Sequence, residues 1–235
     1  MSSSYTPVAS GPSSTTPPPQ PRRLDWGRVA MVPVSVLLGA LVLARLGKLV
    51  GGTGQSTATA AVSAVVTGAL SAAFYLLIIR AYLRRGPARA TTREPLALAA
   101  GPVATFLPFT LPWLGHGSSA DGLLLLGDVL LAAGFGFSVW SVRCLDRSLS
   151  VVPQARSLVQ RGPYSRVRHP LYLGELVAML GLAIALGGVA PLLVWAALAA
   201  LQAYRAVQEE HLLGSTLPGY AEYSARTGRI VPGVF

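Results

Sequence analysis

The stretch Arg161–Gly174, read as RGPYSRVRHPLYLG, leads into the apolar C-terminal part of the chain and decides how that part folds. Gly162 and Pro163 favour a turn, whereas Pro170 favours the first turn of a helix, where no amide hydrogen is needed. Mostly apolar residues follow from 171 to 207, with two glycines and a proline at 187–191. Glycines followed by proline end one helix and start another. We therefore expect a helical hairpin over residues 171–207.

Small residues recur along the first arm of this hairpin, at intervals of four, three and four positions. They are Gly174, Ala178, Gly181 and Ala185. This spacing places them on one helix face, as close packing between membrane helices requires. The second arm offers a matching set, Ala196, Ala199, Ala200 and Ala203, and we expect the two arms to pack through these surfaces.

The composition is that of a membrane protein. The 235 residues are 52% hydrophobic and 12% charged, whereas soluble domains carry about 25% charged residues. Four further apolar runs, at 29–47, 58–79, 95–114 and 121–142, approach the roughly 20 residues that cross a bilayer. We predict an all-α, polytopic membrane protein with four transmembrane helices in 29–142, followed by a region at 143–235 that contains the hairpin.

The basic residues indicate the orientation of the chain. The links at 80–94 and 143–169 are rich in arginine, whereas the link at 115–120 has no lysine or arginine. Positive charge marks the cytoplasmic side, so both termini, the 143–169 loop and the C-terminal segment are expected there, with residues 1–28 as a disordered cytoplasmic tail. The net charge of +10 is explained by this topology, and we expect no nucleic-acid partner. One lysine and many Ala, Arg and Gly residues indicate a GC-rich, bacterial genome, so we expect the protein in a bacterial inner membrane.

Polar residues that can carry chemistry meet on this predicted cytoplasmic face. His169 lies at the hairpin entrance between Tyr164 and Tyr172, and Arg205 and Glu209 lie one helical turn apart near the exit. Each alone has an ordinary explanation: histidines and tyrosines anchor helices at membrane interfaces, and an i,i+4 pair supports a helix by a few tenths of a kcal/mol. Together, at membrane depth where ionisable groups are costly, they indicate a functional site.

Two other carboxylates have less defined roles. Glu210 points to a different side of the helix from Glu209, so the two need not act together. Glu175 follows Gly174 at the hairpin entrance, and either a catalytic or an interfacial role is open. The single cysteine, Cys144, excludes an intrachain disulfide, and no metal-ligand pattern is present, so no metal site is expected.

The C-terminal region resembles the isoprenylcysteine carboxyl methyltransferase family. The resemblance rests on Leu158-Val159 with Gly162-Pro163-Tyr164, on Arg168–Gly174, on Arg205-x-x-x-Glu209-Glu210, and on Gly219-Tyr220-x-x-Tyr223 with Arg229–Pro232. It covers about residues 145–235. It implies an integral membrane methyltransferase that uses S-adenosylmethionine without a Rossmann fold, with the cofactor enclosed by the loop before the hairpin, the hairpin entrance and the C-terminal segment.

Position by position, the resemblance implies a set of functional residues. Arg205 is expected to face the methyl acceptor, Glu209 is expected to serve catalysis and bind the cofactor, and Glu210, Glu175 and Tyr223 are possible additions. The remaining cofactor-binding residues are expected to be Ser157, Leu158, Val159, Tyr164, His169, Pro170, Leu171 and Tyr172. The family's eukaryotic members have a further cofactor-binding glutamine upstream. This chain has a shorter link there, reading Val151-Val152-Pro153-Gln154, so we do not carry that contact over.

The identity of the acceptor is left open by the sequence. A carboxylate is already a nucleophile and needs only Arg205 to orient it, and we favour a small lipid acid of this kind. An amine or hydroxyl acceptor, as in phospholipid N-methylation, needs a base, for which Glu209, Glu210 or His169 is available. We expect a lipophilic acceptor to enter from the bilayer between the hairpin and the fourth helix. The competing hypotheses are a sterol-type membrane reductase that binds NADPH and a non-enzymatic membrane scaffold or transporter.

Overall fold

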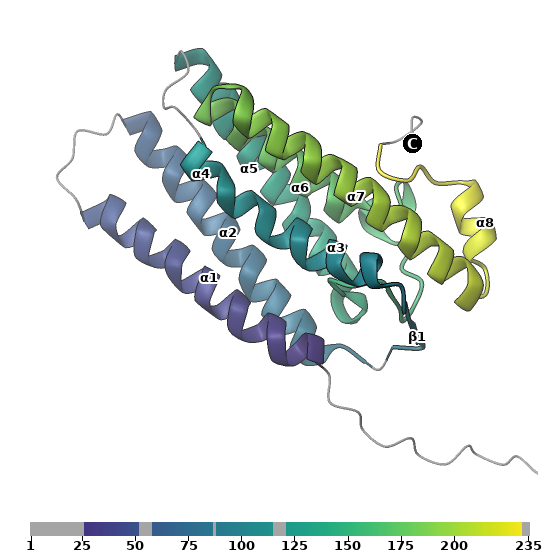
Figure 1. The fold of residues 1–235 in the computed structure, drawn as a ribbon. Coiled ribbons are helices and arrows are strands. Elements are labelled where there is room, and N and C mark those ends of the chain that lie inside the picture. The colour runs from purple at the N-terminus through teal and green to yellow at the C-terminus, as the bar shows by residue number, and fades with distance from the viewer. Residues whose placement is uncertain (1–25, 52–57, 87, 115–120, 232–235) are drawn as a thin grey trace, which may run out of the picture.

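The protein is mostly helical (Figure 1). The computed structural model describes residues 26–51, 58–86, 88–114 and 121–231, so the expected N-terminal tail lies outside the described residues up to residue 25. The α-helices are α1 (Trp26–Gly51), α2 (Ala58–Arg84), α3 (Pro95–Phe106), α4 (Leu111–Leu114), α5 (Asp121–Leu145), α6 (Pro170–Leu186), α7 (Val189–Thr216) and α8 (Tyr220–Ala225). Three 3₁₀ turns occupy Leu107–Thr110, Asp146–Ser148 and Gly162–Ser165.

The long helices lie side by side in one bundle (Figure 1). Going through the bundle, α1 packs on α2, α2 on α5, α5 on α6, and α6 on α7, with α3 lying along α7. Two described helical stretches, Gly122–Leu145 and Val189–Thr216, are long and apolar enough to cross a membrane. Shorter apolar stretches occur at Val29–Leu41, Pro95–Thr110 and Pro170–Leu186. These features suit an integral membrane protein, whereas the number of spans stays a prediction.

The third predicted helix, over 95–114, is not continuous. It divides into α3, the 3₁₀ turn at Leu107–Thr110 and α4. Pro108 and Pro112 have no amide hydrogen to donate to the preceding turn, which interrupts the hydrogen-bond ladder of a regular helix. The Thr110 hydroxyl donates to the carbonyl of Leu107, 2.8 Å away, within the 3₁₀ turn.

The hairpin turn lies where the glycines predict it. Helix α6 ends at Leu186 and α7 begins at Val189, so only Gly187 and Gly188 separate them. Their φ angles are 68° and 83°, a region that residues with a Cβ rarely adopt. The second arm is longer than the expected end at 207, because α7 continues to Thr216 and carries the glutamates beyond the apolar part of the hairpin.

The small-residue face of α6 packs on α5, and the expected packing between the two hairpin arms through small residues is wrong. A Cβ on Gly134 would lie 2.6 Å from the carbonyl oxygen of Gly174, and one on Gly127 would lie equally close to that of Gly181. The α5 glycines Gly127 and Gly134 lie opposite the α6 glycines Gly181 and Gly174, so the two helix backbones are in direct contact. Helix α7 instead places large side chains on α6: Trp195 donates its indole N–H to the carbonyl of Leu176, at 2.9 Å.

A two-stranded antiparallel sheet departs from the all-α prediction. Strand β1 (Ala90–Thr91), in the link after α2, pairs with β2 (Gln154–Ala155), in the loop before α6. The amide of Arg89 donates to the carbonyl of Ala155 at 2.7 Å. Neither strand has a hydrophobic pattern of its own. The two links meet at one end of the bundle, and pairing gives their backbone N–H and C=O groups hydrogen-bond partners.

The C-terminal segment returns to the hairpin entrance. After α8, Gly228 forms a parallel bridge with Val167, the amide of Arg168 donates to Gly228 at 2.8 Å, and the amide of His169 donates to Arg229 at 2.9 Å. Residues 217–231 therefore lie beside the first turn of α6, where they form part of the site.

Candidate cofactor site

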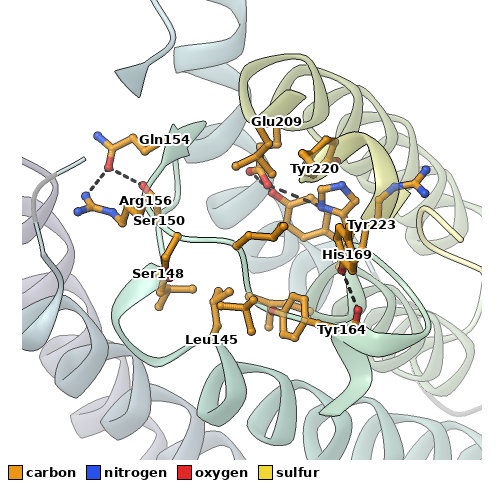
Figure 2. Close-up of a pocket in the computed structure, with 18 of the residues that line it drawn as sticks. Leu145, Ser148, Ser150, Gln154, Arg156, Tyr164, His169, Glu209, Tyr220 and Tyr223 are labelled. Atoms are coloured by element: carbon orange, nitrogen blue, oxygen red, sulfur yellow. Dashed lines mark hydrogen bonds and ion pairs between the residues drawn. The ribbon is translucent and has the colours of Figure 1, made fainter. Parts of the chain in front are cut away.

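A cleft that is partly open to solvent lies at the end of the bundle where α5 ends and α6 begins. One wall is residues 148–159, which we name the cleft loop, and the opposite wall comes from the entrance of α6, the end of α7 and α8 (Figure 2). The lining residues are Leu145, Ser148, Leu149, Ser150, Val152, Gln154, Arg156, Ser157, Leu158, Val159, Tyr164, Arg168, His169, Leu171, Tyr172, Glu209, Leu213, Tyr220 and Tyr223.

The cleft brings together most of the residues that the resemblance implies. Those that line it are Ser157, Leu158, Val159, Tyr164, His169, Leu171, Tyr172, Glu209 and Tyr223. Pro170 does not line it, because it is fully buried at the start of α6. Arg205, Glu210 and Glu175 also lie outside the lining and have the separate surroundings described below.

Glu209 is held against the cleft by two aromatic side chains of the hairpin entrance. The Tyr172 hydroxyl donates to Glu209 Oε1 in a short hydrogen bond, and His169 Nδ1 lies 3.7 Å from Glu209 Oε2. The rings of His169 and Tyr172 stack with centroids 5.2 Å apart and an interplanar angle of 11°. These contacts orient the carboxylate of Glu209 at the cleft wall, where it can attract a cationic ligand.

Glu210 has a different role from Glu209. Its carboxylate accepts hydrogen bonds from Arg168 Nε at 2.7 Å and from Arg229 Nε at 3.0 Å, and it lies 3.3 Å from His169 Nε2. Arg168 also donates to the backbone carbonyls of Ser224 and Thr227. Glu210 therefore ties the C-terminal segment to the hairpin entrance, which accounts for its absence from the cleft lining.

Arg205 lies behind Tyr172, away from the cleft. Its guanidinium carbon is 4.7 Å from the centroid of the Tyr172 ring, and only 5% of the residue is exposed. Its two terminal nitrogens donate to Gln202 Oε1 at 2.9 Å and to the Val151 carbonyl at 2.8 Å. Among the described residues, Arg205 Nε has no hydrogen-bond partner and no carboxylate forms an ion pair with this side chain.

Glu175 belongs to the same buried polar group as Arg205. Its Oε2 accepts a short hydrogen bond from the Gln202 side-chain amide, and Gln202 in turn accepts from Arg205. Glu175, Gln202 and Arg205 thus form one chain of hydrogen bonds between α6 and α7. This arrangement places Glu175 in the protein interior beside Arg205, and an interfacial anchor would not have these contacts.

Tyrosines from the C-terminal segment close the cleft. The Tyr223 hydroxyl donates to the backbone carbonyl of Tyr164 at 2.7 Å, and burial raises the pKa of Tyr223 to about 12. Burial also raises the pKa of Tyr164 and of Tyr220, with the Glu209 and Glu210 carboxylates adding to the respective shifts. All three hydroxyls are therefore protonated at neutral pH and can act as hydrogen-bond donors.

The residues present fit a compact, cationic, partly aromatic ligand such as S-adenosylmethionine. The Tyr220 hydroxyl is buried at the cleft and has no partner among the described residues, an arrangement that costs about 1–3 kcal/mol unless a ligand atom accepts from it. Glu209 supplies a negative charge, and aromatic faces attract a sulfonium by the cation–π interaction. Leu158, Val159 and Leu213 offer apolar surface to a purine ring.

Several residues that line the cleft were not among the site residues predicted from the sequence. Gln154, to which we assigned no cofactor contact, lines the cleft and accepts hydrogen bonds from Arg156 at 2.6 Å and Ser150 at 3.0 Å. Its position depends on the pairing of β2 with β1, which no local pattern indicates. Tyr220 carried a signal, because it lies three residues before Tyr223 in the C-terminal motif and therefore on the same side of a helical turn.

The described residues form a helical bundle with a polar and aromatic cleft at one end. Residues 123–216 match the family described as phospholipid methyltransferase. The matched residues make up less than half of the chain. The matched region begins inside α5, upstream of the 143–235 region that the sequence indicated. This match supports a membrane methyltransferase domain in the C-terminal part of the chain.

Two relatives have names from metal resistance. The chain is 36% identical over 133 residues to the cobalt-zinc-cadmium resistance protein CzcN of Cupriavidus metallidurans, a region that is 55% of this chain and 60% of that protein. It is 37% identical over 84 residues to the nickel-cobalt-cadmium resistance protein NccN of Alcaligenes xylosoxydans xylosoxydans, covering 34% of this chain and 38% of that protein. The chain therefore spans less than two thirds of the length of either relative.

Proposed function

We propose that the protein is a membrane-embedded methyltransferase that moves a methyl group from S-adenosylmethionine to a lipophilic acceptor. The observation that carries the proposal is the placement of Glu209 at the cleft wall, fixed by Tyr172 and His169. The match of residues 123–216 to the phospholipid methyltransferase family supports the same reaction class.

The protein's own contribution is to bind and position the reactants. When bound, S-adenosylmethionine supplies an electrophilic methyl group on a positively charged sulfur. Glu209 and the tyrosine rings favour that charge, and the Tyr220 hydroxyl is available to a polar atom of the cofactor. Because methyl transfer is an in-line displacement, fixing the two reactants in a narrow range of orientations provides most of the acceleration.

The favoured acceptor is a carboxylate, such as that of an isoprenylcysteine-like molecule or another small lipid acid. Arg205 is a buried cation whose terminal nitrogens donate to neutral oxygens, and its Nε–H has no partner among the described residues. An acceptor carboxylate would supply a direct ion pair and the missing hydrogen-bond acceptor. A carboxylate needs no base, so Arg205 would only hold and orient it.

A phospholipid amine is the second candidate, because residues 123–216 match a family described by that substrate class. An ammonium group must lose a proton before it can accept a methyl group, and His169, between Glu209 and Glu210, is placed to accept one. Nothing among the described contacts favours the sterol-type reductase considered for this sequence.

The membrane setting is part of the proposal. We place the protein in a bacterial inner membrane with four N-terminal spans, the hairpin, and both termini in the cytoplasm, so that the cleft opens on the side where S-adenosylmethionine is made. The acceptor enters from the bilayer. The expected route between the hairpin and the fourth helix has no space where the α5 and α6 backbones meet at Gly134 and Gly174, so entry uses another side of the hairpin.

Calorimetric titration of the detergent-purified protein with S-adenosylhomocysteine tests the reaction class. We expect micromolar binding that Glu209→Gln weakens by about tenfold to a hundredfold, because a charge-assisted contact to the ligand is lost. Glu222→Gln is the matched control, since the Glu222 side chain is 81% exposed on α8. If the folded wild-type protein binds NADPH and not S-adenosylhomocysteine, the proposal fails and the reductase hypothesis replaces it.

Transfer of labelled methyl groups separates the two acceptor classes. The wild-type protein is incubated with labelled S-adenosylmethionine and either a prenylcysteine or a phosphatidylethanolamine vesicle. We expect methyl esters from the prenylcysteine, with Arg205→Gln raising the KM for that acceptor and leaving S-adenosylhomocysteine binding detectable. Base-stable N-methyl products from the vesicle would assign the amine reaction instead.

The names of the two relatives suggest a physiological setting. We propose that the methylated lipid contributes to tolerance of divalent transition metals, as the names CzcN and NccN indicate for those proteins. A strain that lacks this protein should grow more poorly on cobalt, zinc or cadmium, and wild-type protein should restore growth whereas Glu209→Gln should not. If wild-type protein and Glu209→Gln restore growth equally, metal tolerance does not depend on methyl transfer.

A further inference from the structure

The backbone of Val151 is held from three directions at the edge of the cleft. Its amide donates to the hydroxyl oxygen of Tyr82 on α2 at 2.9 Å. Its carbonyl accepts from a terminal nitrogen of Arg205 on α7 at 2.8 Å. On α3, a Cβ built on Gly101 would collide with the same carbonyl, so only a glycine allows α3 to approach this closely.

These three contacts fix the part of the cleft loop that faces the ligand. Ser150 and Val152, on either side of Val151, both line the cleft, as does Gln154 two residues further. Neither Tyr82 nor Gly101 lines the cleft, and both lie outside residues 123–216, the part that matches the methyltransferase family. The cleft loop therefore depends on contacts from the N-terminal half of the chain.

Tyr82 itself is well fixed. It is 1% exposed, it packs in the cluster formed with Ile78, Val142 and Leu149, and the Arg85 guanidinium lies 4.3 Å above its ring. A hydroxyl on a rigid ring is a precise hydrogen-bond partner, because little conformational freedom is lost when the bond forms. Removing only that hydroxyl would leave the packing of the ring in place.

We propose that Tyr82 is a positioning residue for methyl transfer, acting with Arg205 on the two sides of Val151 to set the cleft loop for the cofactor. The inference rests on the proposed function. It also links the two ligand sites: Arg205, expected to orient the acceptor, uses the same guanidinium to hold the loop that lines the cofactor cleft.

Tyr82→Phe tests the proposal, with Tyr204→Phe as the matched control. The Tyr204 hydroxyl donates to Glu94 at 3.0 Å on an exposed surface, so its loss also removes one tyrosine hydrogen bond but does not affect the cleft loop. We expect Tyr82→Phe to weaken S-adenosylhomocysteine binding by about threefold to tenfold, the effect of one hydrogen bond. Tyr204→Phe should bind and unfold as the wild type does, whereas Tyr82→Phe should lower the unfolding temperature by only a few degrees, the effect of one hydrogen bond.

Kinetics separate positioning from general destabilisation. In Tyr82→Phe the KM for S-adenosylmethionine should rise by the factor seen in binding, while kcat at saturating cofactor stays within about twofold of wild type. The effects of Tyr82→Phe and Arg205→Lys on S-adenosylhomocysteine binding should be non-additive, because both act on Val151. Additive effects would refute the shared anchor.

Gly101→Ala provides an independent variant if Tyr82→Phe folds poorly. The new methyl group displaces the Val151 carbonyl, and S-adenosylhomocysteine binding should weaken. Gly136→Ala, at a helical glycine with open space around it, should not affect binding. If the wild type binds S-adenosylhomocysteine and both Tyr82→Phe and Gly101→Ala bind it with the same affinity, the positioning role alone is overturned. Absence of binding in the wild type would overturn the proposed function and the positioning role together.

Discussion

Helix α6 has two sides that are built in opposite ways. Toward α5 it presents glycine and alanine, and the two backbones approach so closely that Gly134 and Gly174 have no room for a side chain. Toward the cleft and α7 it presents Tyr172 and Glu175, and His169 directly precedes its first turn. The polar atoms of these three side chains are nearly all engaged by partners from other elements.

This difference shows how one helix can hold functional side chains in defined positions. Close backbone packing on α5 fixes the height and rotation of α6, since a small shift would produce collisions along the whole interface. The polar side of the helix then carries groups whose positions are set by specific hydrogen bonds. The following predictions concern folding stability on the two sides, from the largest expected effect to the smallest.

Gly134→Leu breaks the packed side. The new side chain has to enter the space occupied by the backbone of Gly174 and Ala178, so α5 and α6 must separate. We expect a loss of about 3 kcal/mol or more, at the upper end for overpacking, visible as a lower unfolding temperature in detergent. Gly136→Ala on the same helix is the control and should not lower it. A stable, ligand-binding Gly134→Leu would contradict the role of this interface.

Glu210→Gln weakens the contacts that α7 makes with the entrance of α6. The carboxylate is shared by Arg168, Arg229 and His169. We expect a loss of about 2 kcal/mol, less than the 3–5 kcal/mol for a fully buried pair, because the Arg229 side chain is 25% exposed. Limited proteolysis should cut the C-terminal segment faster than in the wild type. Unchanged protection of residues 217–231 would show that Glu210 does not hold this segment.

Tyr223→Phe removes one hydrogen bond beside the cleft, that from α8 to the Tyr164 carbonyl, and should cost about 1 kcal/mol. The hydroxyl also gives a pH dependence. The folded pKa of about 12 is above the unfolded value of 10.0, so its contribution is complete below pH 10 and is lost as the pH rises toward 12. Thermal unfolding measured from pH 9 to 11 should decline less steeply in Tyr223→Phe than in the wild type.

Arg226→Ala is expected to have the smallest effect. Arg226 pairs with Glu222 at 3.5 Å on α8, with side chains 56% and 81% exposed. An exposed i,i+4 pair contributes about 0.3–0.5 kcal/mol, so the unfolding temperature should hardly change. A large loss would mean that the contact of Arg226 with Gln160, at 2.6 Å, stabilises the segment after the cleft loop more than the exposure of Arg226 suggests.

The helical fold was largely predictable because it depends on local signals. Apolar runs predicted the long helices, and two glycines predicted the turn between α6 and α7. Pro108 and Pro112 indicate the break between α3 and α4, whereas hydropathy alone predicted one continuous helix. Which helix receives the small-residue face of α6 was not local information: both α5 and α7 contain small residues, and the choice depends on how the whole bundle assembles.

The candidate site was predictable where it follows one continuous motif. The stretch from Ser157 to Tyr172 and the turn that contains Glu209 supply most of the cleft wall. The sequence did not predict that Gln154 lines the cleft or that Tyr82 and Gly101 hold Val151. These contacts join residues about 50 to 70 positions apart, and backbone groups, which carry no residue-specific signal, supply half of each contact.

The bridge between Val167 and Gly228 has a consequence for the order of events during synthesis. Tyr220 and Tyr223 are translated after the helices α1 to α7, so these helices can assemble before the last part of the cleft wall exists. The cleft is therefore completed in two stages, and the residues that close it are synthesised in the second.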